Sequence, residues 1–281
     1  MIKTYIKFFI LIAITISFSQ LSFAQNISNS NNPEVIREIN QYLKTVNLDK
    51  GSISSKENLN NFLADAFKDG WNNEIQFWVS AQWGTIEYKG FVSKQFELKG
   101  NHLTSIGNGN RPAKISEGKY FGINFDGDND YWVNSSFKTV QPFSIFIVYK
   151  TDDTKTESVL LESAGAKVNQ IRVENGKDGK PELVIESAGT YRIPGLTNGI
   201  NYILIEYNMK DSRVFINEKL VYNNFIGLSD FDGIQIGKGT VNNKYNHLKG
   251  SIYEIGIIQN SLNEQARNNL FNLMKKTYDL K

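Results

Sequence analysis

The pattern of apolar and polar positions in the last third of the chain predicts β-structure. Val214-Phe-Ile216 and Leu220-Val-Tyr222 stand on either side of the polar break 217–219, which is typical of a hairpin. The run Ile252–Ile258 is apolar on both alternating faces apart from Glu254 and Gly256. This run therefore predicts a core strand that is covered on both sides.

A short helix is expected after the last strand. Ser261-Leu-Asn-Glu264 has the spacing of a capping box, in which the serine hydroxyl accepts from a backbone amide and the glutamate returns the bond. Apolar residues then recur at helical spacing, at Leu262, Ala266, Leu270, Leu273 and Met274. We expect this stripe to attach the helix to the sheet.

Two further helices are expected before the strands. The first begins at Pro33 and ends near Asn47, with the stripe Ile36, Ile39, Leu43 and Val46. The second follows a capping box at Ser54-Ser-Lys-Glu57 and ends near Gly70, with the stripe Leu59, Phe62, Leu63 and Phe67. An isolated pair of this length buries too little apolar surface to be stable, so we expect it to pack on the sheet.

The first 24 residues have the pattern of a signal peptide. Lysines at positions 3 and 7 precede an apolar stretch over 8–18, and Ser22-Phe-Ala24 is a small-x-small cleavage site. The apolar stretch is short for a bilayer span, and no later segment is long and apolar enough. We therefore expect cleavage after Ala24 and export as a secreted, periplasmic or cell-surface protein, with a retained membrane anchor as the alternative. A linker and helical segment is then expected over 25–70 and a sandwich over 71–281.

Four motifs in order resemble the laminin-G-like, concanavalin A-like jelly-roll family, from about Asn101 to the C-terminus. They are Gly122-Ile-Asn-Phe-Asp-Gly-Asp-Asn-Asp-Tyr-Trp132, the strand Pro142–Lys150, the hairpin, and Gly250-Ser-Ile-Tyr-Glu254. The resemblance implies an antiparallel β-sandwich with glycan binders, adhesion modules, structural proteins and some enzymes among its members. Glu218 stands where the family usually has glycine, which weakens the prediction of a tight type I′ turn.

Composition narrows the choice of partners. Among 281 residues there is no cysteine, so a chain of this size relies on its core instead of disulfides. The formal net charge is +2, with lysines and acids interleaved. Nucleic acid and anionic membranes are therefore not expected partners, whereas a glycan or a protein is.

The acidic residues contain no complete metal-binding or catalytic motif. Asp126, Asp128 and Asp130 alternate as calcium ligands do, but Tyr131 stands where an EF-hand loop needs glycine. We expect a polar turn and no cofactor, with calcium as the alternative. The Glu-x-Asp-x-x-Glu string of hydrolases on this fold is absent, and the nearest run, Glu182-Leu-Val-Ile-Glu186, is expected at a solvent-facing edge.

A candidate ligand rim combines amides, aromatic faces, a cation and an imidazole, which suit pyranose rings. Its residues come from the segment 241–247, expected to be a loop, and from the end of the Asp-rich segment: Tyr131, Trp132, Asn243, Tyr245, Asn246 and His247. By contrast, Trp71, Trp78 and Trp83 are expected in the core. The sequence favours a non-catalytic carbohydrate-binding or adhesion module. One alternative is a polysaccharide-active enzyme, a lyase in preference to a hydrolase, with Tyr and His or Lys; the other is a structural surface protein with a protein partner.

Overall fold

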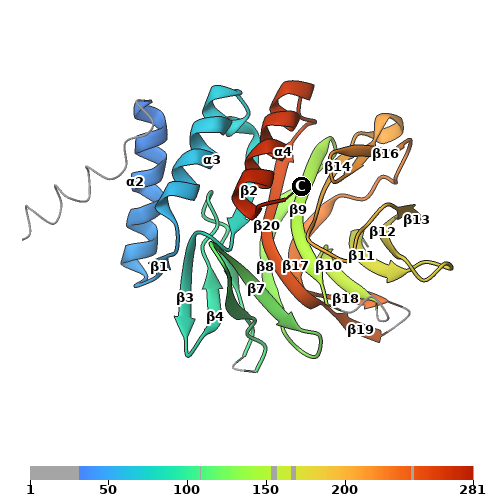
Figure 1. The fold of residues 1–281 in the computed structure, drawn as a ribbon, viewed down its shortest axis with the longest axis horizontal. Helices are drawn as coiled ribbons and strands as arrows, with labels where there is room; N and C mark the ends of the chain where they lie inside the picture. Colours follow the sequence, from blue (N-terminus) through green and yellow to red (C-terminus); the bar gives the residue numbers. More distant parts are fainter. Residues whose placement is uncertain (1–31, 108, 153–156, 166–168, 242–243, 281) are drawn as a thin grey trace, which may run out of the picture.

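The computed structural model describes residues 32–280 except 108, 153–156, 166–168 and 242–243. The expected signal peptide and Asn243 therefore lie outside the described residues. Three helices lie side by side on one face of an antiparallel β-sandwich (Figure 1). None of the described helices has the length and apolar character needed to cross a membrane.

Two runs of antiparallel strands form the sandwich. In the first, named the helix-side sheet, neighbouring strands follow the order β6 (Ala113–Glu117), β7 (Tyr120–Asp126), β20 (Lys249–Gln259), β9 (Phe143–Thr151), β14 (Asn201–Tyr207), β15 (Arg213–Ile216) and β16 (Lys219–Asn223). Strand β2 (Ile75–Ser80) pairs with the second half of β20, beyond β7. β20 therefore lies inside the sheet with partners along both of its edges.

The second run, named the outer sheet, continues through a bridge between β4 and β6, which nearly closes the structure. Its order is β1 (Ser52–Ile53), β3 (Gly84–Tyr88), β4 (Phe91–Gln95), β5 (Leu103–Thr104), β8 (Trp132–Thr139), β17 (Phe231–Ile236), β10 (Ser158–Glu162), β11 (Asn169–Asn175), β12 (Pro181–Ser187) and β13 (Thr190–Pro194). A separate hairpin, β18 (Lys238–Val241) and β19 (Lys244–His247), lies at its lower right in Figure 1.

The helices begin at side-chain caps close to the expected ones. In α2 (Pro33–Leu48), the Asn32 side chain accepts from the Glu34 amide. In α3 (Lys56–Lys68) the cap is Ser55, and in α4 (Glu264–Tyr278) it is Asn263, so the predicted caps Ser54 and Ser261 are wrong by one and two residues. A second hydrogen-bonding side chain lies beside each predicted serine, and sequence spacing alone does not decide between them. Two short 3-10 helices complete the set, η1 (Asn72–Glu74) and η2 (Met209–Asp211).

Two apolar cores confirm that the helices pack on the sandwich. One lies between the sheets and the other between the helix-side sheet and the helices. Strand β20 contributes to both, with Ile255 and Ile257 in the first and Tyr253 and Ile258 in the second. The covering of β20 on both faces is therefore confirmed. Trp71, Trp78 and Trp83 are at most 3% exposed, as expected for core residues.

The β15–β16 hairpin turns at Asn217 and Glu218, which have φ angles of 48° and 70°. Positive φ at both central residues is the geometry of a type I′ turn. The turn therefore forms despite Glu218, whose side chain Oε1 lies 3.1 Å from Lys275 Nζ on α4.

Candidate functional site

The hairpin β18–β19 lies directly against the outer sheet. Thr240 donates its backbone N–H to Glu162 Oε2 at 2.8 Å and accepts from Gln170 Nε2 at 3.2 Å. A Cβ atom on Gly239 would lie 2.0 Å from Glu162 Oε2, so any other residue there would displace the Glu162 carboxylate from the hairpin. The segment expected as a loop is thus a hairpin held by polar contacts, and the expectation is corrected. Its strands bury few apolar side chains, which is why no hydrophobic alternation marked them.

Four side chains gather on the side of this hairpin that faces away from the outer sheet. Lys238 is paired with His247 and Thr240 with Tyr245, and residues that are opposite or two apart share a face. The Lys238 ammonium lies 4.4 Å from the ring centroids of both Tyr131 and Tyr245. Tyr131, Lys238, Tyr245 and His247 are named the rim cluster.

Burial and the nearby Lys238 ammonium lower the pKa of His247, with Asp128 and Asp126 acting in the opposite direction. The imidazole is therefore neutral at neutral pH and can accept a proton. The rim cluster thus brings together three kinds of group. They are the neutral imidazole of His247, the Lys238 ammonium beside two aromatic rings, and the phenolic hydroxyls of Tyr131 and Tyr245. This set can take up one proton, neutralise one negative charge and return a proton.

Two of the predicted rim residues have other roles. Trp132 is 1% exposed and packs edge-on against Phe125, with the two ring centroids 5.5 Å apart. Trp132 therefore belongs to the core, and its assignment to the rim is corrected. Trp132 is the first residue of β8, and the large apolar surface of its indole explains this burial. Asn246 is on the sheet-facing side of the hairpin and donates to Glu157 Oε2 at 2.5 Å. It anchors the hairpin to the loop before β10.

The Asp-rich segment forms local turn contacts. Asp126 Oδ1 accepts from the amides of Asp128 and Asn129 at 2.8 and 3.2 Å, and Asp130 Oδ2 accepts from the Asp126 amide at 3.1 Å. These bonds are the ones that a polar turn predicts. Among the described residues, no group of three or more His, Cys, Asp or Glu side chains has a geometry that would hold a metal ion. Calcium binding here stays the untested alternative to the plain turn.

Arg172 forms ion pairs with two acidic residues of the outer sheet. Arg172 on β11 donates to Gln170 Oε1 at 2.8 Å, contacts Glu174 at 2.5 Å and reaches Glu186 on β12 at 3.0 Å. The side chain of Arg172 is 4% exposed. Strand β12 lies between β11 and β13, so the expectation of a solvent-facing edge at Glu182 and Glu186 is corrected. Ion pairing to Arg172 commits Glu174 and Glu186 to a structural network.

Sequence reasoning missed Lys238 as a functional candidate. The sequence did contain a signal for a hairpin, because Asn242-Asn243 stands between the segments 238–241 and 244–247. Asparagine is common in hairpin turns. A hairpin centred there places Lys238 opposite His247. The short polar strands made a loop the simpler interpretation.

Comparisons with known proteins find relatives by structure alone. No family model matches the chain, and no curated protein sequence matches it. A Trypanosoma rangeli sialidase solved in complex with sialic acid superposes with a TM-score of 0.53 at 11% identity, covering 73% of this chain and 34% of the sialidase. A GH54 α-L-arabinofuranosidase soaked with a cyclic sulfate inhibitor gives 0.53 at 10% identity, covering 74% of this chain and 60% of that one.

These likenesses establish the β-fold that the chain shares with carbohydrate-active proteins, and this chain spans about a third of the sialidase's length. They also correct one prediction. The non-catalytic module was the favoured function, but the structural neighbours are glycoside hydrolases. The non-catalytic module is therefore withdrawn as the favoured function.

Proposed function

We propose that this chain is an exported enzyme that cleaves an acidic polysaccharide by β-elimination at the rim cluster. The observation that carries the proposal is the Lys238 ammonium held 4.4 Å from two tyrosine rings, on the same hairpin face as His247 with its lowered pKa. General acid–base catalysis needs a base that is unprotonated at the working pH. His247 meets this condition.

Each residue of the rim cluster has one role in the reaction. Lys238 pairs with the carboxylate of a uronate and stabilises the charge that develops when the adjacent C5–H bond breaks. His247 takes the C5 proton as the base. The electron pair forms the C4=C5 double bond, the C4–O4 bond breaks, and a hydroxyl of Tyr131 or Tyr245 gives its proton to O4. The products are a new chain end and an unsaturated sugar.

Two further points support the substrate class. The sialidase with the same fold was solved with sialic acid, an acidic sugar. The carboxylates Glu174 and Glu186 are held in ion pairs with Arg172, whereas Lys238 makes cation–π contacts and is suited to an incoming carboxylate. The finer assignment to the laminin-G-like, concanavalin A-like family and the export by a cleaved leader are parts of the same proposal, supported by the motif order and by residues 1–24.

The test is an assay on a panel of uronate-containing polysaccharides, with neutral glucans beside them. We expect ultraviolet absorbance from the conjugated C4=C5 bond together with shortening of the acidic chains. His247→Ala should lower the rate about a hundredfold to ten-thousandfold, the range for loss of a general base. The rate should rise with pH through a pKa below the ordinary value for histidine, because the base acts in its neutral form.

Lys244→Ala is the matched control, since Lys244 is exposed on the opposite face of the same hairpin. It should leave the rate unchanged, whereas Lys238→Ala should reduce it. New reducing ends without unsaturation would contradict the proposal and indicate hydrolysis. Equal effects of the Lys238 and Lys244 substitutions would contradict the assignment of the rim cluster.

A further inference from the structure

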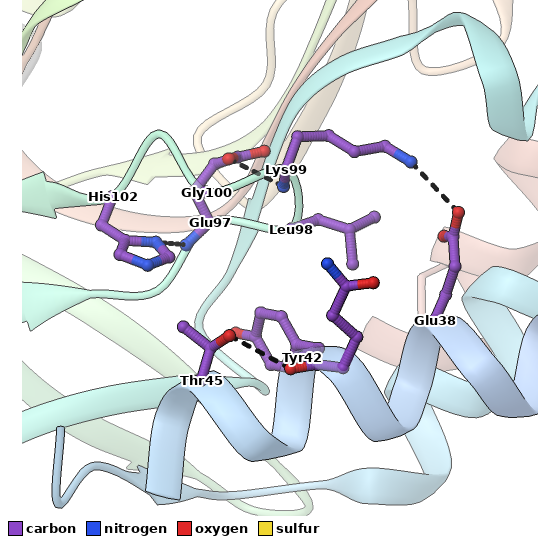
Figure 2. Close-up of a pocket in the computed structure, with 9 residues that line it drawn as sticks. Glu38, Tyr42, Thr45, Glu97, Leu98, Lys99, Gly100 and His102 are labelled. Atoms are coloured by element: carbon purple, nitrogen blue, oxygen red, sulfur yellow. Dashed lines mark hydrogen bonds and ion pairs between the residues drawn. The ribbon is translucent and has the colours of Figure 1, made fainter. Parts of the chain in front are cut away.

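A second polar hollow lies between α2 and the loop that joins β4 to β5, far along the chain from the rim cluster (Figure 2). Its volume is about 230 Å³. One wall is a single face of α2, because Glu38, Gln41, Tyr42 and Thr45 follow helical spacing. The other wall is the segment 97–102.

The walls of the hollow are held in place before any ligand arrives. Glu97 is 1% exposed, and its carboxylate accepts from the amides of Trp78, Lys99 and Asn101 at 2.8, 2.8 and 2.7 Å. Tyr42 donates its hydroxyl to the Phe96 carbonyl at 3.1 Å and accepts from the Gly84 amide at 3.0 Å. Such preorganisation lowers the entropy cost of binding.

Several polar groups at the hollow remain open to a ligand. Gln41 lines the hollow, and its side chain makes no hydrogen bond within the described part of the chain. Lys99 Nζ lies 3.4 Å from Glu38 Oε1, in a partly exposed pair that is weak in water. His102 Nδ1 accepts from the Glu97 amide at 3.1 Å, so a neutral ring carries its proton on Nε2 as a donor.

We infer that this hollow binds a single acidic sugar, with the sugar carboxylate on Lys99 and its hydroxyls on Glu38 and Gln41. The groups available are a cation, a neutral amide, an imidazole N–H and one carboxylate acceptor. A doubly charged phosphate would face Glu38 and the buried Glu97, whereas a uronate brings one negative charge and hydroxyl donors that suit Glu38. A site of this size is below the roughly 300–1,000 Å³ of sites for larger ligands, which favours one sugar over a chain.

The choice of an acidic sugar rests in part on the proposed function, since elimination on an acidic polymer releases such sugars. The hollow then acts as a product or end-group site away from the rim cluster. Its chemistry is independent of catalysis, so binding and cleavage can be measured separately.

The test is titration calorimetry of the full mature chain with glucuronate, using glucose and acetate as comparison ligands. We expect glucuronate to bind and both comparison ligands to bind at least about tenfold more weakly, because each offers half of the required groups. Lys99→Ala should weaken glucuronate binding about tenfold or more, and Gln41→Ala should weaken it severalfold. Lys44→Ala removes a lysine of α2 that is outside the hollow and should have no effect.

Unaltered glucuronate binding in both Lys99→Ala and Gln41→Ala, each with a wild-type melting temperature, would overturn the inference. Absence of glucuronate binding to the wild type would also overturn it. The two proposals separate through His247→Ala, which should abolish cleavage and leave glucuronate binding intact. If the wild type binds glucuronate through Lys99 but cleaves no polysaccharide, the proposed reaction is wrong, whereas the inferred sugar site in the hollow is supported.

Discussion

Glu254 shows how one buried residue connects the sheet to the last helix. Its carboxylate is 1% exposed and accepts from Trp78 Nε1 at 2.9 Å, Ser80 Oγ at 2.7 Å and Tyr278 Oη at 2.6 Å. The sequence motif contained this glutamate without indicating its role. Two donors from β2 and one from α4 meet at Glu254, so it fixes the position of α4 over β20.

The same burial predicts a pH-dependent stability. Burial raises the pKa of Glu254 from 4.5 to about 7. The native state therefore holds this proton more tightly than the unfolded state, and the stabilisation is complete below pH 4.5 and is lost as the pH rises to about 7. The loss is on the order of 3 kcal/mol for this group. In urea unfolding at pH 5 and pH 8, Glu254→Gln should show a smaller difference than the wild type. An identical difference would contradict a raised pKa.

At the scale of elements, the sequence pattern correctly predicted the helices and strands whose positions depend on contacts between residues close together in the chain. The apolar stripe of α4, the start of α2 at Pro33 and the two-sided burial of β20 follow from residues close together in sequence. The hairpin β18–β19 could not be predicted in this way, because its attachment depends on Glu162 and Gln170, which are distant in the chain. The rim cluster likewise depends on a register that pairs Lys238 with His247, and the network of Arg172 depends on strand order. Non-local pairing of polar side chains leaves no periodic trace in a sequence.

The turn at Asn217 and Glu218 offers a second prediction. A residue with a side chain at φ 70° is strained, and glycine is not. Glu218→Gly should therefore raise the free energy of unfolding by about 1 kcal/mol, less a small amount for the partly exposed contact with Lys275. Glu218→Ala removes the same contact but keeps the strain, so it should be less stable than the glycine variant. Urea midpoints of the three proteins give the comparison. Equal midpoints for alanine and glycine would contradict strain at this turn.

At the scale of the whole molecule, the two cores are joined through one strand. Ile255 is fully buried and pairs with Val79 on one side and Ile147 on the other. Ile255→Asp would place an unpaired carboxylate in the core between the sheets. The free energy of unfolding should then fall by more than about 4 kcal/mol. We expect no folded protein by circular dichroism, whereas Lys249→Asp at the exposed start of β20 should fold. A soluble Ile255→Asp variant with an unchanged melting curve would contradict the topology.

The central place of β20 also sets the order in which the chain can assemble. Residues 249–259 follow every other strand of the helix-side sheet in the sequence, yet they fill the gap between β9 on one edge and β2 and β7 on the other. Until they emerge, β2 and β7 have no neighbour on that side and the sheet cannot close. The helix-side sheet therefore stays open until all of its other strands have been synthesised. Membrane passage in an unfolded form, as proposed above for an exported chain, is compatible with that late closure.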